Sequence, residues 1–266
     1  HLFAALAKHL RESLSAVESG AADKYAAWDE AHCVWDGALR TLATRAEAAA
    51  AGDPIVADID AALDAGHDAI GGDAPATTMD DWRVPPARQV VEKTLFRAAH
   101  REIVAQAERA ASAADPTAAA RALGAFGIVR DRLEGRNTPG IAVIEAMLSG
   151  DAAAIDAGAV RRELDVAFAK RTRNYADQAF VDGLGIPSSY KGAVEGRTYA
   201  KLIAAGMAAA GLSTAGYLAD WDDYVARVRV GDDEAAAREV SQRLVAATCA
   251  YQAALGIAAC TGDADE

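Results

Sequence analysis

Apolar side chains recur at steps of three and four residues along most of the chain, and this spacing is typical of one face of an α-helix. One stripe near the N-terminus consists of Phe3, Leu6, Leu10, Leu14 and Val17. Two further stripes consist of Tyr25, Trp28, His32, Trp35, Leu39 and Leu42, and of Leu244, Ala247, Tyr251 and Leu255. No strand-like alternation competes with this spacing. The pattern therefore predicts an all-α protein.

Proline and glycine residues divide the helical pattern into segments. The dividing residues are Pro54, Gly71, Gly72, Pro75, Pro85, Pro86, Pro116, Pro139, Pro187 and Gly211. The segments between them predict a multi-helix bundle of about ten helices. The longest loop is expected to run from Gly71 to Arg83 and to hold Trp82.

Acidic residues stand where several of these helices are expected to begin. Asp53 and Asp115 each precede a proline, so each is expected to cap a helix that starts with that proline. Asp232, Asp233 and Glu234 place negative charge where a helix N-terminus favours it.

Three segments resemble one another in the placement of their apolar residues. They begin at Val90, Ala159 and Arg238, and a shorter helical segment precedes each of them. Their alignment superposes Val91, Val160 and Val240, then Leu95, Leu164 and Leu244, and then Ala98, Ala167 and Ala247. We therefore expect a single all-helical domain over residues 1–266, built from two or three degenerate repeats with units at 20–113, 114–182 and 187–260. Chance similarity among alanine-rich helices is the alternative.

Composition narrows the classes of function. Alanine dominates the apolar residues and aromatic residues make up only 6% of the chain, as expected for closely packed helices. The formal net charge of −12 argues against binding to nucleic acid or to an anionic membrane surface, which both require a basic patch. The charge suits a soluble protein or one that binds cations.

Neither a membrane-spanning segment nor a leader is expected in this chain. No apolar run reaches the roughly 18 residues that a membrane helix needs. Residues His1 to Leu10 lack the ordered basic, apolar and cleavage regions of a signal peptide, which fits a mature or trimmed form of a secreted protein. Cys33, Cys249 and Cys260 show no metal-binding spacing, and a pairing of Cys33 with either of the others stays open.

The first candidate metal ligands are Asp29, His32 and Asp36. Their spacing of three and four residues places them on one face of a helix. Carboxylates and neutral imidazole are suitable ligands for iron and other transition metals. His32 also belongs to the stripe that contains Trp28 and Trp35, so it is expected to point inward. The alternative is a core histidine hydrogen-bonded to its neighbouring aspartates.

Further candidate ligands lie on two later helices. Glu92 and His100 belong to the helix that begins near Val90, where Glu102 falls on the buried stripe and would need a partner. The alternative there is a solvated charged face, neutralised by Arg97 and Arg101.

Glu195 and Tyr199 are one helical turn apart and could together bind iron(III) as hard oxygen donors. The alternative for this pair is a tyrosine packed against a glutamate. Asp64 and His67 repeat the Asp-x-x-His spacing, but at a helix end, where a histidine compensates the helix dipole.

Motifs of catalysis are absent from the sequence. A ferritin-like di-metal site needs Glu-x-x-His on two helices, and the chain contains only Asp-x-x-His, at 29–32 and 64–67. The acidic pairs at 80–81 and 222–223 lack the motif context of prenyl-diphosphate enzymes. There is no phosphate loop, dinucleotide-binding motif, nucleophile elbow or haem attachment motif. We therefore expect no enzymatic activity.

The segment KYAAWDEAHCVWDGAL, from Lys24 to Leu39, resembles the recurring opening of the low-iron-inducible periplasmic protein family. These are iron-assimilation proteins of algae, with bacterial lipoprotein relatives. Segments AAHREI from Ala98 and AVEGRTYAKLIAAG from Ala193 are similar to internal helices of that family. The resemblance covers the chain from about Tyr25 to Ile257.

The resemblance implies an all-helical protein of the periplasm or cell surface, including the case of a trimmed lipoprotein. Such a protein binds iron, presents it to a membrane transporter or another protein, and performs no catalysis. The resemblance adds Glu30, and the full candidate set is Asp29, Glu30, His32, Asp36, Glu92, His100 and Glu195. The middle unit, near Ala120, lacks a comparable acidic cluster, so any site is expected to draw on the first and last units.

Two other functions remain as alternatives. A helical-repeat scaffold that binds a protein or peptide would show a concave surface with an exposed apolar groove. A di-metal helical-bundle oxidase would bring four or more ligands from separate helices into one buried pocket.

Overall fold

A computed structural model describes residues 2–50, 52–70 and 79–261, and every regular element in these ranges is helical. The first six helices are α1 (Leu2–Glu18), α2 (Lys24–Val34), α3 (Arg40–Ala49), α4 (Ile55–Ile70), α5 (Met79–Ala113) and α6 (Pro116–Leu133). The others are α7 (Thr138–Ser149), α8 (Ala157–Tyr175), α9 (Ala179–Asp182), α10 (Pro187–Ala209), α11 (Thr214–Val230) and α12 (Glu234–Ala254). The prediction of an all-α multi-helix bundle is confirmed.

Two short elements complete the description. The π-helical turn η1 (Trp35–Leu39) joins α2 to α3 in one continuous helix, and the 3₁₀ turn η2 (Ala152–Ala154) precedes α8. With α2, η1 and α3 taken together, and the single turn of α9 left aside, the described residues form ten helices, as expected. No helix in these ranges is both long enough and apolar enough to cross a membrane.

Capping explains several of the helix starts. The side chain of Asp115 accepts hydrogen bonds from the amides of Thr117 and Ala118, as predicted for a residue before proline. Asp233 caps α12 in the same way. Asp53 behaves differently, because its carboxylate faces Arg97 and Arg101 across the bundle at 3.5 Å from each.

The start of α5 differs from the expected loop. Residues 71–78 lie outside the described residues, but from Met79 onward the chain is helical and includes Trp82. Pro85 and Pro86 lie inside this helix. Proline removes backbone hydrogen bonds and usually ends a helix. Here Val84 and Ala87 are buried, and this packing holds the turn in place despite the missing donors.

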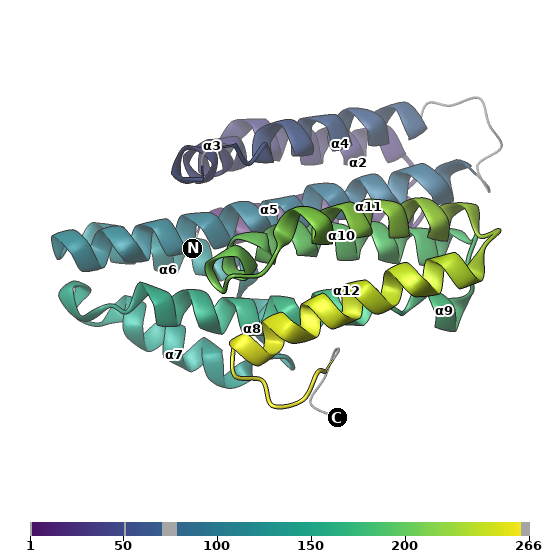
Figure 1. Ribbon diagram of the computed structural model, residues 1–266. Coiled ribbons are helices and arrows are strands. Elements are labelled where there is room, and N and C mark those ends of the chain that lie inside the picture. Colours follow the sequence, from purple (N-terminus) through teal and green to yellow (C-terminus); the bar gives the residue numbers. More distant parts are fainter. Residues whose placement is uncertain (1, 51, 71–78, 262–266) are drawn as a thin grey trace.

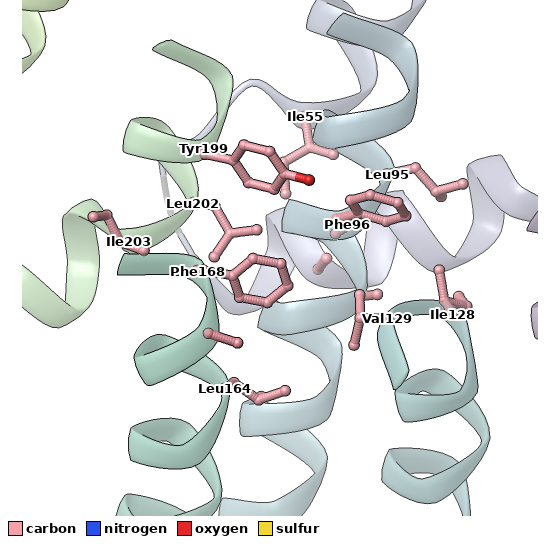
Figure 2. Packing of buried hydrophobic residues seen from close by; sticks show 14 of the residues in the cluster. Ile55, Leu95, Phe96, Ile128, Val129, Leu164, Phe168, Tyr199, Leu202 and Ile203 are labelled. Atoms are coloured by element: carbon pink, nitrogen blue, oxygen red, sulfur yellow. The ribbon is translucent and has the colours of Figure 1, made fainter. Parts of the chain in front are cut away.

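Helix α5 runs through the middle of the bundle (Figure 1). Helices α2, α3 and α4 lie along one side of it, and α7, α8 and α12 lie along the opposite side. Helix α10 packs on α5, α8 and α11, so it links the two sides. Figure 2 shows Phe96, Phe168, Tyr199 and Leu202 packed together between these helices. All the buried apolar side chains of the described residues except Ala237 belong to a single cluster that extends from α1 to α12.

The aligned residues of the expected repeats occupy the three helices α5, α8 and α12. The leucines Leu95, Leu164 and Leu244 are fully buried, and the aligned valines are nearly so. Burial of this kind is common to all core helices, so the repeat remains a prediction.

Candidate functional site

The continuous helix α2–η1 carries the first four candidate ligands on the outside of the bundle, with Asp29, Glu30 and His32 on α2 and Asp36 on η1. Two tryptophans attach it to α4: the indole N–H of Trp28 donates to the Leu63 carbonyl at 2.9 Å, and that of Trp35 donates to Asp60 at 2.8 Å. Both rings are fully buried. The opposite side of α2 is therefore turned to solvent, where Asp29, Glu30 and Asp36 lie exposed.

His32 does not point into the core, so the expected inward orientation is wrong. Its side chain is 37% exposed and lies 3.5 Å from Asp36. The reason is that α2 packs at the edge of the bundle, where its buried face contains only Trp28 and Ala31. A residue at the margin of so narrow a face turns outward.

Each exposed carboxylate of α2 pairs with a histidine. Besides His32 with Asp36, His9 of α1 lies 3.0 Å from Glu30. His67 at the end of α4 lies 3.7 Å from Asp29. Helices α1 and α4 thus each bring one histidine to α2, which contributes a third itself. We call Asp29, Glu30, His32, Asp36, His9 and His67 the α2 face.

The α2 face is open to water, which determines what it can bind. Its three carboxylates are 52–60% exposed, so pairing with histidine adds little stability. Asp36 also receives a hydrogen bond from Arg40 at 2.9 Å, and Glu30 receives one from Ser13 at 3.1 Å. Within the described part of the chain no three acidic, histidine or cysteine side chains converge to hold a metal ion. Each pair therefore offers one oxygen and one nitrogen, and water would have to complete a metal's coordination.

Glu92 and Glu195 meet in the core, but around a lysine. The ammonium of Lys93 lies 3.1 Å from Glu92 and 3.3 Å from Glu195. All three side chains are at most 6% exposed. The ammonium also lies over the rings of Phe96, at 5.3 Å, and Tyr199, at 5.7 Å. We call Glu92, Lys93, Glu195 and Tyr199 the lysine cluster.

Charge in the lysine cluster is retained despite burial. Burial by itself lowers the pKa of the Lys93 ammonium, but Tyr199, Glu195 and Glu92 outweigh that effect and raise the pKa above 10.5. Burial raises the pKa of Glu92, whereas the cations of Lys93 and Arg88 bring it below 4.5. A lysine ammonium thus occupies the position between two carboxylates that a metal would take in a di-metal site.

Glu195 acts on two buried tyrosines. Burial raises the pKa of Tyr199, and the negative charge of Glu195 raises it further against the opposing charge of Lys93. Tyr175 hydrogen-bonds with Glu195, and its pKa is raised by burial and by the negative charge of that carboxylate. The Tyr175 ring stacks on Tyr199 with centroids 6.2 Å apart. Arg171 also approaches Glu195, at 3.7 Å. Glu92 of the first predicted repeat unit and Glu195 of the last unit thus lie together in this cluster, where they form ion pairs.

His100 belongs to a separate buried group. Its Nε2 lies 2.8 Å from Asp165, and the hydroxyl of Tyr251 donates to the other oxygen of Asp165 at 2.6 Å. All three residues are at most 2% exposed. Gly206 makes room for this contact, because a Cβ there would collide with the Tyr251 hydroxyl and with Asp165. His100 is therefore held by a carboxylate and a tyrosine from two other helices.

The alternative of a solvated charged face on α5 is not realised. Glu92, His100 and Glu102 are all buried, and Glu102 pairs with Arg45 at 3.0 Å. Arg97 and Arg101 do not neutralise them but face carboxylates of the α3–α4 region. The central position of α5, enclosed on several sides, leaves no solvated face along this stretch.

Sequence reasoning missed the residues that complete these sites. No motif points to His9, and the helix-end position of His67 does not reveal that this residue also reaches Asp29. Lys93 and Asp165 carried no signal, because a lysine or aspartate in an alanine-rich helix usually lies on the surface.

The cysteines pair within the C-terminal region. Cys249 of α12 forms a disulfide with Cys260, and Cys33 on α2 is free and exposed. The open alternative of a bond to Cys33 is therefore not realised. Cys33 is the one free thiol among the described residues. It follows His32 in the sequence of α2 but is not one of the residues of the α2 face.

Exposed large apolar residues are scattered over the described surface. They are Leu2, Tyr25, Val143, Val181 and Val230. Each belongs to a different helix, from α1 to α11. These five residues therefore do not form one continuous apolar patch. A separate hollow of about 510 Å³ between α1, α6 and α7 has a mostly apolar lining that includes Ala4, Leu123 and Phe126, so the scaffold alternative stays open.

Compared with protein-family models, with curated proteins and with solved structures, the chain gives no match. The fold therefore defines the class of protein as an all-α helical bundle, and its function has to be argued from its own residues.

Proposed function

We propose that this protein binds iron outside the cytoplasm, on the α2 face, and passes it to a membrane transporter or another protein. The observation that carries the proposal is that His9, His32 and His67 each lie beside a carboxylate of α2. Carboxylate oxygen and imidazole nitrogen are ligands that iron accepts. The resemblance of residues 24–39 to low-iron-inducible periplasmic proteins points to the same helix.

The openness of the α2 face suits delivery better than storage. Two protein ligands and several waters hold a metal loosely, so it can exchange quickly with a second protein. The net charge of −12 favours accumulation of cations near the surface. The proposal includes no catalysis, and the lysine cluster, with its own ammonium between the carboxylates, is not part of the iron site.

The test is iron uptake by protein prepared without chelator. Offered Fe(II) under nitrogen, or Fe(III), the wild-type chain should take up iron at a fixed saturating ratio, measured by equilibrium dialysis with elemental analysis. Its melting temperature should rise, because a ligand at about 100 times its Kd stabilises the native state by about 2.7 kcal/mol. The triple variant Asp29→Asn, Glu30→Gln, Asp36→Asn should lose most of this iron.

A matched set of variants distinguishes direct ligation of iron from the general effect of negative surface charge on iron binding. Glu12→Gln, Glu108→Gln and Glu134→Gln together remove three carboxylates that are 56–62% exposed elsewhere, and this control should bind as wild type does. A variant with His9, His32 and His67 changed to Gln tests whether nitrogen ligands take part. Absence of both stoichiometric iron and thermal stabilisation in the wild type would refute the proposal.

The redox state of the cysteines tests whether the protein resides outside the cytoplasm, as proposed. Disulfides persist in oxidising compartments such as the periplasm or cell surface, and Cys249 and Cys260 form one here. We expect protein isolated from its native cells, with thiols blocked at lysis, to carry the block on Cys33 alone. Mass spectrometry of unreduced peptides would reveal the Cys249–Cys260 link. Blocking at all three cysteines would place the protein in a reducing compartment instead.

A further inference from the structure

The π-helical turn η1 brings a carboxylate and an arginine together at the end of α2. It runs from Trp35 to Leu39, and the amide of Arg40 donates to the carbonyl of Trp35, five residues earlier. Trp35 and Leu39 are fully buried. Asp36 and Arg40 directly follow them and lie together at the surface, with side chains that are 52% and 36% exposed. Turns of this kind are frequent at functional sites.

The guanidinium of Arg40 is hydrogen-bonded to one oxygen of Asp36, while the other oxygen faces His32. Nε of Arg40 donates to Oδ1 of Asp36 at 2.9 Å, and Nη2 lies 2.8 Å from the same oxygen. The second oxygen, Oδ2, lies 3.5 Å from Nε2 of His32. The contact with Arg40 therefore restricts rotation of the carboxylate and keeps Oδ2 on the side of the imidazole.

Asp60 of α4 holds Arg40 in place from behind. Nη1 and Nη2 of Arg40 donate to the two oxygens of Asp60, at 2.9 and 2.7 Å, which is a bidentate pairing. Asp60 also accepts a hydrogen bond from the indole of buried Trp35 at 2.8 Å. The guanidinium lies over the ring of Trp35, 5.4 Å from its centroid. Arg40 is thus fixed to the core of the bundle.

The pairing with Asp60 also determines how Arg40 acts on Asp36. The hydrogen bond with Asp60 raises the pKa of Arg40 more than the hydrogen bond with Asp36 does, and burial acts in the opposite direction. Asp60 is therefore the stronger partner and compensates the charge of the guanidinium. Arg40 acts on Asp36 mainly as a fixed donor.

We propose that Arg40 is the positioning residue of an iron site formed by His32 and Asp36. The inference rests on the proposed iron function and assigns a role to a residue that is not itself a ligand. Nε2 of His32 and Oδ2 of Asp36 would bind the metal, and Arg40 keeps the carboxylate turned toward it. Carboxylates that bind a metal are commonly hydrogen-bonded in this way, and loss of the outer partner costs about 10- to 100-fold in metal affinity.

The experiment uses a parent variant that keeps His32 and Asp36 as the one carboxylate–histidine pair of the α2 face. Asp29→Asn and Glu30→Gln create it by removing the other two carboxylates. Titrated with Fe(II) under nitrogen, the parent should bind iron in equilibrium dialysis and show paramagnetic broadening of the His32 ring signals. Adding Arg40→Gln should weaken binding about tenfold, the lower end of the range because Asp36 is half exposed.

The sign of this effect distinguishes positioning from charge. A role through charge alone would give the opposite result, because removing a cation strengthens the binding of another cation nearby. Arg40→Lys keeps the charge but loses the planar fork, so it should also weaken binding. The matched control is Arg130→Gln. Arg130 is 46% exposed and likewise joins a carboxylate four residues later, Glu134, to one on a neighbouring helix, Glu145, so its loss should leave the affinity unchanged.

A measurement on the metal-free protein tests the geometry separately. Nε of Arg40 donates to Asp36, whereas the two Nη atoms donate to Asp60. The NMR signal of this Nε–H should therefore exchange with solvent more slowly in the wild type than in Asp36→Ala. Equal exchange rates would overturn the inference whatever the result with iron.

The remaining outcomes separate the inference from the iron function. If the wild type binds iron but Arg40→Gln binds as tightly as its parent, or more tightly, the inference fails and the iron function stands. Iron binding by the wild type but not by the parent would place iron at the other pairs and would also overturn the inference. Absence of iron uptake by the wild type would refute both.

Discussion

Replacing Lys93 by methionine is expected to lower the free energy of unfolding by about 3 to 5 kcal/mol, because two buried carboxylates lose their shared cation. Methionine keeps most of the side-chain volume, so the loss reports charge more than packing. In a chain of this length about 1 kcal/mol corresponds to about 2–4 °C, and the melting temperature should fall by about 10 °C. Urea unfolding followed by circular dichroism measures the effect, with an unchanged m-value as a check on compactness.

Two further variants isolate the cause of that loss. Lys8→Met removes a lysine that is 67% exposed, and it should change stability by less than about 0.5 kcal/mol. Adding Glu92→Gln and Glu195→Gln to Lys93→Met removes the stranded charges and should recover a large part of the loss. If this triple variant is no more stable than Lys93→Met alone, unpaired charge is not the cause.

The lysine cluster also explains why the proposed iron site does not include the buried Glu92 and Glu195. Glu92 and Glu195 converge from α5 and α10, as ligands of a di-metal centre would. The cation between them is supplied by the chain itself, within the aromatic rings of Phe96 and Tyr199. Held in this way by Lys93, the two carboxylates join α5 to α10, and the proposed iron site remains the exposed α2 face.

Sequence alone was sufficient for the fold because helical periodicity is a local property. Steps of three and four residues between apolar positions, with aspartate before proline at Asp115, predicted an all-α bundle and about ten helices. The start of α5 was missed for a related reason. Pro85 and Pro86 are strong local signals, and only the burial of Val84 and Ala87 against other helices overrides them.

The candidate sites could be predicted only in part, because their second halves come from distant helices. The spacing of Asp29, His32 and Asp36 on one helix is visible in the sequence. The approach of His67 to Asp29 and of His9 to Glu30 depends on how α4 and α1 pack on α2. The position of Lys93 between two glutamates depends in the same way on the packing of α10 against α5.

The α2 face depends on one close approach between helices, and this gives the second large prediction. Gly66 of α4 lies directly under the indole ring of buried Trp28. A Cβ at Gly66 would lie inside the normal contact distance of several ring atoms, including Cε2 at 2.8 Å. Gly66→Ala should therefore force Trp28 and α2 away from α4, at a cost of about 3 kcal/mol, the upper range for overpacking.

Gly124 in α6 provides the matched control, because a Cβ there meets nothing within 4 Å. Gly124→Ala should stabilise the protein by about 0.5 to 1 kcal/mol, since alanine loses less backbone entropy in a helix. Urea unfolding of both variants, with tryptophan fluorescence as a probe of Trp28, measures the contrast. Because Trp28 places Asp29 beside His67, Gly66→Ala should also weaken iron uptake while Gly124→Ala leaves it unchanged. Equal stability of the two alanine variants would mean that α2 does not pack on α4 through this contact.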